Sequence, residues 1–151
     1  MGNFALKSTA FKDGGIIPAR HTCDGDDVNP FLEIRDAPPN TKSFALIVDD
    51  PDAPGGVWDH WLVWNIDGKT QYLSEDSIPA GAFQGLSGAG HSKWGGPCPP
   101  RGNDPHHYRF TLYALDTILT LAAGAKRAEL EDAIAGHILA KTSITGIYER
   151  K

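Results

Sequence analysis

The 151-residue sequence has only two cysteines and no apolar run near the roughly 18 residues that a membrane-spanning helix requires. Its first residues, Met1–Lys7, lack the long apolar stretch of a signal peptide. Cationic residues are also scarce, since 14 Lys and Arg stand against 19 Asp and Glu and give a net charge of −5. Nucleic-acid surfaces need clustered Lys and Arg, so this balance argues against one. We therefore expect a cytoplasmic protein with no membrane span and no nucleic-acid partner.

The two cysteines, Cys23 and Cys98, lie far apart in the sequence. Without a secretion signal, such a pair is expected as reduced thiols rather than as a disulfide. Both stand in turn-like, accessible segments, so oxidation stays open as the alternative. With 40% hydrophobic and 22% charged residues, the composition is ordinary for a globular protein. We expect residues 1–151 to form a single domain.

The sequence is rich in residues that form turns, because 17 glycines and 11 prolines are spread between short apolar runs. This pattern predicts a mostly β fold. The stretch FALIVD is almost continuously apolar, so we expect a strand buried on both faces. The expected strands are Phe44–Asp49, Trp61–Ile66, Tyr108–Leu115 and Ile144–Tyr148, with weaker signals over Asn3–Phe11 and Phe31–Ile34.

One main α-helix is expected in the C-terminal half, over Lys126–Ala140. There Leu130, Ile134 and Ile138 recur every four residues and share one helix face. A shorter helical stretch is expected near Ser74–Ile78. Between these elements lies a long, mostly irregular stretch from residue 80 to residue 103, and loops of that length in a compact domain usually have a function.

The segment Gly95–Tyr108 reads GGPCPPRGNDPHHY and carries four prolines, three glycines, two histidines and a tyrosine. Proline fixes φ and removes hydrogen-bond donors, so this run is neither a helix nor a central strand. The strand-like RFTLYAL that follows it indicates a rigid loop on a β scaffold rather than a linker. We interpret the segment as a wall of a ligand pocket.

Three carboxylates stand at the end of the FALIVD strand, within the stretch Asp49–Pro54. An Asx-Pro turn that ends the strand would account for them without any function. In a functional interpretation, Asp50 and Asp52 stand at a pocket mouth and accept hydrogen bonds from a ligand. They are two residues apart, so both would face one side if the strand geometry continued.

Histidines stand at the start of two expected strands. His60 lies between tryptophans, where a packed structural histidine is the plainer interpretation. Of the adjacent His106 and His107, strand alternation lets only one face a pocket, and His106 shares its face with Tyr108. Imidazole and phenol groups donate hydrogen bonds, so the combined set suits a phosphate, phosphonate or carboxylate. Two histidines and a carboxylate would also suit zinc, but no HExxH spacing supports a metal site.

Known catalytic templates are incomplete in this chain. The stretch Gly85–Ala89 misses the second glycine of a nucleophile elbow, and neither a dinucleotide fingerprint nor a Walker loop is present. We therefore predict no catalytic residue and no cofactor. The alternative is a hydrolase in which His60 and His106 act as acid and base and Asp50 orients them. It lacks a convincing nucleophile, because Cys98 stands between two prolines with no evident base.

Three motifs, DDPDAP, WDHWLVWNI and GGPCPPRGNDPHHYRFTLYALD, together resemble the phosphatidylethanolamine-binding proteins, also called Raf kinase inhibitor-like proteins. The early IPARHTCDG and the closing GIYER are similar to the bacterial and archaeal branch of that family. The likeness covers essentially the whole chain. It implies a Greek-key arrangement of two antiparallel sheets and non-catalytic binding of a small anion or phosphate-bearing head group. Some members inhibit kinases or proteases, so a protein partner is also implied.

The resemblance places the pocket on named positions of this chain. The implied ligand-binding residues are Asp50, Asp52, His60, Gly96, Cys98, Pro100, His106 and Tyr108. Residues 96–100 would form a wall and lend backbone N–H groups, and the Ala53–Pro54 bond would be cis. Two departures stand out: His107 replaces a frequent arginine, and the sequence stops soon after Tyr148, without the helix that flanks the pocket in animal members. The branch also suggests a homodimer.

Overall fold

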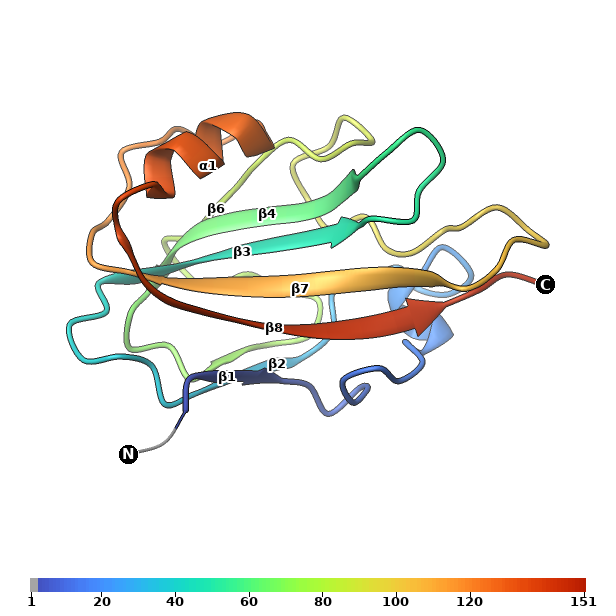
Figure 1. Ribbon diagram of the computed structural model, residues 1–151, viewed down its shortest axis with the longest axis horizontal. Coiled ribbons are helices and arrows are strands. Elements are labelled where there is room, and N and C mark those ends of the chain that lie inside the picture. The colour runs from blue at the N-terminus through green and yellow to red at the C-terminus, as the bar shows by residue number, and fades with distance from the viewer. Residues whose placement is uncertain (1–2) are drawn as a thin grey trace.

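The computed structural model describes residues 3–151 and consists mainly of two antiparallel β-sheets (Figure 1). The five-stranded sheet has the order β6-β4-β3-β7-β8, and the three-stranded sheet has the order β1-β2-β5. The larger sheet contains β3 (Ser43–Asp50), β4 (Trp58–Asp67), β6 (Phe83–Gln84), β7 (His106–Leu115) and β8 (Ile138–Tyr148). The smaller one contains β1 (Ala5–Lys7), β2 (Leu32–Arg35) and β5 (Tyr72–Leu73). The helices are the 3-10 turn η1 (Ala19–His21) and α1 (Arg127–Ile134).

The core consists of two layers, one on each face of the larger sheet. Every residue of β3 is buried, as the unbroken apolar run predicted. Phe44, Leu46 and Val48 pack into the layer between the sheets, whereas Ala45 and Ile47 pack into a layer with α1. The predicted fold class, mostly β with two antiparallel sheets and one α-helix, is confirmed.

The helix is shorter than predicted. It ends at Ile134, and Gly136 follows with a φ of 81°, a conformation that glycine adopts without strain. The chain then enters β8 at Ile138, which pairs with Leu115 at the edge of the sheet. The four-residue spacing that seemed to continue the helix therefore runs into a strand. Likewise, the stretch expected to be helical near Ser74–Ile78 contains only turns and irregular backbone.

Two expectations about covalent geometry are wrong. Cys23 and Cys98 form a disulfide, with their Cα atoms 5.4 Å apart. A backbone hydrogen bond of 3.1 Å from the N–H of Cys23 to the carbonyl of Pro97 brings the two segments together, and sequence distance gave no sign of this. There is also no cis peptide bond in residues 3–151, so Ala53–Pro54 is trans. The loop turns instead at the two following glycines, whose φ values are 86° and 122°.

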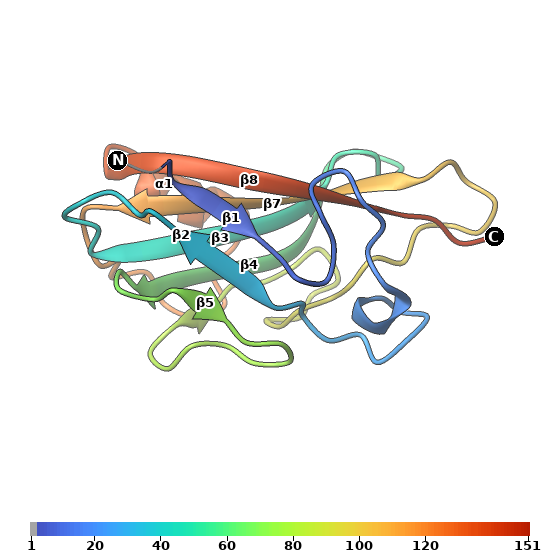
Figure 2. The ribbon, with the colours of Figure 1, turned by 90° about the horizontal axis from the view of Figure 1, so that it is seen from below.

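The long strands bring distant loops together at one end of the molecule. Strand β3 ends where β4 and β7 begin, and Figures 1 and 2 show the loops beyond these strands gathered at the end that also carries η1 and the C-terminus. Helix α1 lies on the outer face of the larger sheet, toward its other end. Across residues 3–151, no helix combines the length and the apolar character needed to cross a membrane.

Candidate ligand pocket

A cavity of about 600 Å³ opens at the end of the larger sheet where the loops gather. Apart from Asp52, every predicted site residue lines it: Asp50, His60, Gly96, Cys98, Pro100, His106 and Tyr108. These residues come from the end of β3, the start of β4, the start of β7 and the loop before β7. Their contact with a ligand stays a prediction.

Strand alternation sorts the two adjacent histidines. His106 and Tyr108 lie on the face of β7 that turns inward, and they are only 4% and 1% exposed. His107 lies on the opposite face and is exposed. Within the pocket, His106 Nδ1 lies 2.7 Å from Asp50 Oδ2, and Asp50 Oδ1 accepts a hydrogen bond of 2.8 Å from the N–H of Asp52. Asp50 therefore fixes both the histidine ring and the start of the loop.

A β-bulge aims His60 into the cavity. Val48 pairs with Trp61 whereas the next residue of β3, Asp49, pairs with Asp59, so His60 is the extra residue of β4. Such a bulge changes the direction of a side chain that regular alternation would send elsewhere. The ring is 8% exposed, its Nδ1 lies 2.6 Å from the carbonyl oxygen of Gly95, and it meets the ring of Tyr108 edge-on at 5.2 Å.

Burial shifts the pKa values of His60 and Tyr108. It lowers the pKa of His60 below the usual 6.5, although the bond to Gly95 and the charge of Asp50 oppose the shift. Burial also raises the pKa of Tyr108, and the negative charges of Asp50 and Asp52 add to this effect. At neutral pH the pocket therefore presents a neutral imidazole from His60 and a protonated phenol.

Asp52 does not line the main cavity, so the expectation that it shares a face with Asp50 is wrong. The strand ends at Asp50, and period-two alternation ends with it. Asp52 Oδ2 instead accepts two bonds from His107, of 2.8 Å from its backbone N–H and 2.7 Å from Nδ1. These bonds lower the pKa of Asp52. The pair ties the loop after β3 to the start of β7 from outside the pocket.

The proline-rich wall offers few backbone donors, which corrects the expectation that residues 96–100 lend several. Pro97, Pro99 and Pro100 have no N–H, and the N–H of Gly96 donates to Asp27 Oδ1 at 2.8 Å. Cys98 is therefore the one residue of these five that has an N–H to offer. Gly96 is also tightly enclosed, because a Cβ there would lie 2.1 Å from the carbonyl oxygen of His21.

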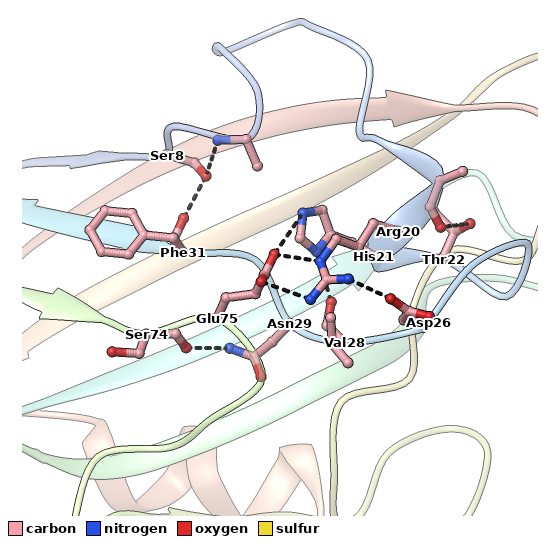
Figure 3. A network of polar contacts seen from close by, with 12 residues as sticks. Ser8, Arg20, His21, Thr22, Asp26, Val28, Asn29, Phe31, Ser74 and Glu75 are labelled. Carbon is pink, nitrogen blue, oxygen red and sulfur yellow. Dashed lines mark hydrogen bonds and ion pairs between the residues drawn. The ribbon is translucent and has the colours of Figure 1, made fainter.

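Figure 3 shows a polar network around η1. The same segment contacts the wall through Asp27, which bonds to Gly96, and Cys23, which bonds to Pro97. His21 is 3% exposed, and its Nδ1 lies 2.9 Å from the carbonyl oxygen of Val28. Arg20 holds Glu75 through two bonds of 2.9 and 3.0 Å. The carbonyl oxygen of His21 then accepts a bond of 3.2 Å from the indole of Trp94, which packs in the core under the wall. The segment around η1 thus positions the wall and also contributes Cys23 and Asp27 to the lining of the cavity.

Sequence reasoning missed several lining residues. They include Asp27, Trp58, Ser87, His91, Lys93 and Trp94. Trp58 had a usable signal, since it stands two residues before His60 at the start of the same strand. Lys93 adds a cation to the pocket from the loop before the wall, where no local pattern marked it.

Asp49, the first carboxylate of the Asp49–Pro54 stretch, binds arginines outside the pocket. Asp49 accepts bonds of 2.8 and 2.9 Å from Arg109 and one of 2.7 Å from Arg127 of α1. Arg127 also reaches Asp59, at 2.8 Å. The repulsion expected among Asp49, Asp50 and Asp52 is thus relieved by a separate partner for each: arginines for the first, His106 for the second and His107 for the third.

The site offers little to a metal ion. In the part of the chain that the structure describes, no group of three or more His, Cys, Asp or Glu side chains is arranged to hold one. Asp50 and His106, which zinc would need, are bonded to each other. The zinc alternative therefore finds no ligand set in residues 3–151.

Comparisons with known proteins agree with these features. The family model described as phosphatidylethanolamine-binding protein matches residues 7–149. A UPF0098 protein of Methanothermobacter thermautotrophicus is 44% identical over 150 residues, which cover 96% of this chain and 98% of the relative. Crystal structures of a putative phosphatidylethanolamine-binding protein homologue from Chlamydia trachomatis and of E. coli YbcL match with TM-scores of 0.94 and 0.93. Their sequence identities are 37% and 35%; the first match covers 100% of both chains, and the second covers 99% of this chain and 100% of YbcL.

Proposed function

Because the chain belongs to the phosphatidylethanolamine-binding protein family, we propose that it binds a small anion, such as a phosphate-bearing head group, in the pocket and does so without catalysis. The observation that carries this proposal is the cluster of Asp50, His60, His106 and Tyr108 around one cavity. Buried polar groups that open onto a shared space are the usual mark of a small-molecule site.

The groups that would hold the anion come from different elements. Tyr108 keeps its phenolic proton because burial raises its pKa, so it can donate a hydrogen bond. Lys93 supplies positive charge from the lining loop, and Cys98, unlike the prolines beside it, has a backbone N–H that can donate a hydrogen bond. The histidines complete the set, with Asp50 fixing the ring of His106.

The test is calorimetric titration of inorganic phosphate and phosphoethanolamine into the wild-type protein and into the His60→Ala and Asp50→Ala variants. Loss of one hydrogen bond to a charged ligand should weaken binding about 10- to 100-fold. His137→Ala is the matched control, because His137 also pairs with an aspartate, Asp116, but lies exposed outside the pocket. Equal affinities in all four proteins, or no binding by the folded wild type, would overturn the proposal.

We further propose that the occupied pocket regulates or inhibits a partner kinase or protease. Val57 and Trp58 beside the pocket are 54% and 42% exposed, and exposed apolar side chains next to a site suit protein contact. Inhibition assays against a panel of kinases and proteases, with and without phosphate, test this idea. Inhibition that Trp58→Ala abolishes would support it, whereas no inhibition across the panel would contradict it.

A hydrolase remains the alternative, and the bond between Asp50 and His106 favours it because an aspartate often orients a catalytic base. The missing part is a nucleophile, since Cys98 is held in the disulfide. A panel of ester, phosphate and peptide substrates should show turnover that His106→Ala abolishes. The absence of such turnover would remove this candidate.

For location and assembly, we propose a cytoplasmic homodimer, as the sequence suggested. The disulfide weighs against the cytoplasm, because structural disulfides are rare there. Cell fractionation decides between the compartments, and alkylation of the extracted protein shows whether Cys23 and Cys98 are oxidised in the cell. Sedimentation velocity gives the assembly state, and a monomer at all concentrations would contradict the dimer.

A further inference from the structure

The hydrogen-bond partners of the two pocket histidines determine which ring nitrogen carries the proton. His60 Nδ1 faces the carbonyl oxygen of Gly95, which can only accept, so Nδ1 carries the hydrogen. His106 Nδ1 faces the carboxylate of Asp50 and donates in the same way. In each neutral ring, Nε2 is then a hydrogen-bond acceptor.

Both Nε2 atoms open onto the cavity. Neither has a hydrogen-bond partner within residues 3–151, although both rings are lining residues and almost buried. No fully buried side-chain nitrogen or oxygen in that part of the chain lacks a partner, so these nitrogens are accessible from the pocket. The pocket therefore presents at least two acceptors, the Nε2 of the neutral His60 ring and the carboxylate of Asp50.

Two backbone donors of the wall are already used. The N–H of Gly95 donates to the carbonyl of His60, and the N–H of Gly96 donates to Asp27. The prolines of the wall have no N–H. The other donors of the lining include the hydroxyls of Tyr108 and Ser87, the indole N–H of Trp58, the backbone N–H of Cys98 and the ammonium of Lys93. An oxyanion with no hydrogen can only accept hydrogen bonds, so its lone pairs would face those of the acceptors and repel them.

We propose that the pocket selects an oxyanion that carries an acidic hydroxyl, namely hydrogen phosphate or a singly protonated phosphate monoester, over one that carries none, such as sulfate. This inference rests on the proposed anion binding and narrows it. The P–OH group donates to an Nε2 or to Asp50, while the other oxygens accept from Tyr108, Cys98 and Lys93.

The selection depends on the imidazole of His60 being neutral. Burial keeps His60 neutral at pH 7.5, against the pull of the nearby carboxylates. The charged or titratable groups around the two rings are Asp27, Asp49, Asp50, Asp52, Asp59, His91, Lys93, His107, Tyr108 and Tyr148. When the pH falls far enough to protonate His60, its Nε2 becomes a donor, and sulfate should then bind as well.

Hydrogen phosphate and sulfate are the sharpest pair of probes, because at pH 7.5 they share shape and charge and differ by one hydrogen. Titrated by calorimetry at constant ionic strength, phosphate should bind about 10- to 100-fold more tightly than sulfate, the value of one well-made hydrogen bond. As the pH is lowered through the folded-state pKa of His60, the ratio should shrink. Equal affinities at pH 7.5 would overturn the inference, whereas binding of neither anion by the folded protein would overturn the proposed function instead.

Two variants separate acceptors from donors. Asp50→Asn replaces an acceptor with an amide that can also donate, so the affinity for sulfate should rise relative to the affinity for phosphate. Tyr108→Phe is the matched control. It removes a donor, so the affinities for both anions should fall together and the ratio of the two affinities should stay the same. A ratio unchanged in Asp50→Asn and collapsed in Tyr108→Phe would reverse the assignment of roles.

A proton count gives an independent readout on the wild-type protein. Methyl phosphate is mostly a dianion at pH 7.5, since the second pKa of a phosphate monoester is about 6. It should therefore take up about one proton from the buffer on binding, which appears as a dependence of the binding enthalpy on the buffer's ionisation enthalpy. Sulfate should show no such uptake at that pH. Methyl phosphate that binds without a proton would contradict the inference.

Discussion

Gly96→Ala should both destabilise the fold and weaken the pocket, because the space at this residue is already filled. A Cβ at Gly96 would lie 2.1 Å from the carbonyl oxygen of His21 and 2.4 Å from Asp27 Oδ1. Neither oxygen is easily displaced, since His21 is held by the η1 network and Asp27 already accepts the N–H of Gly96.

The expected magnitude follows from two separate losses. Overfilling a packed site costs about 1–3 kcal/mol. Stretching or breaking the bond from the Gly96 N–H to the Asp27 carboxylate adds about 1.5–3 kcal/mol. We therefore expect the free energy of unfolding to fall by about 3 kcal/mol or more, and anion affinity to fall with it because the wall moves.

Gly95→Ala is the matched control at the neighbouring position. A Cβ there would meet only the carbonyl oxygen of His60, at 3.9 Å, and Gly95 has no positive φ. Its stability should change by less than about 1 kcal/mol, with a small gain from the less flexible unfolded chain. Urea unfolding of both variants with the disulfide intact provides the measurement. Equal midpoints for the two variants would refute the packing argument at Gly96.

Three further predictions concern stability and titration. Replacing Cys23 and Cys98 together by serine should lower the free energy of unfolding by about 4 kcal/mol, the loop-entropy value for the 75-residue separation, and an unchanged urea midpoint would contradict this. Arg127→Met should lower the free energy of unfolding by about 2 kcal/mol, because it leaves the buried Asp49 with Arg109 as its one remaining arginine partner. Chemical unfolding at neutral pH measures this change. A stabilised variant would contradict the prediction and show that removing the buried charge outweighs the loss of the ion pair. The lowered pKa of His60 means that the unfolded chain takes up this proton more readily, so stability should fall as the pH drops from 6.5 toward the folded-state pKa. His60→Asn should flatten that slope, and a wild type that gains stability over this range would contradict the assignment.

Regular alternation made much of the sheet predictable. The all-apolar FALIVD run predicted a fully buried strand, and β3 is one. The period-two pattern of HHYRFTLYAL predicted that His106 and Tyr108 share a face that His107 does not, and the burial of β7 follows that pattern. In both strands, local sequence and tertiary packing favour the same geometry.

The predictions from sequence were wrong where contacts between distant segments, rather than the local sequence pattern, determine the structure. The bulge at His60 depends on the pairing of β4 with β3, which no pattern in β4 reveals. The disulfide joins two segments whose meeting depends on the fold, and Asp52 turned outward once the strand ended at Asp50. The helix was overextended because a helical spacing happened to continue into β8.

The central claim is that a small anion binds between the ends of β3, β4 and β7. The most direct test is to titrate inorganic phosphate into isotopically labelled protein and to map the changes in the 1H–15N spectrum. We predict that saturable shifts centre on Cys98, His60, Asp50 and the first residues of β7. Shifts that centre instead on Arg109 and Arg127, on the outer face of the sheet, or no saturable shifts at all, would contradict it.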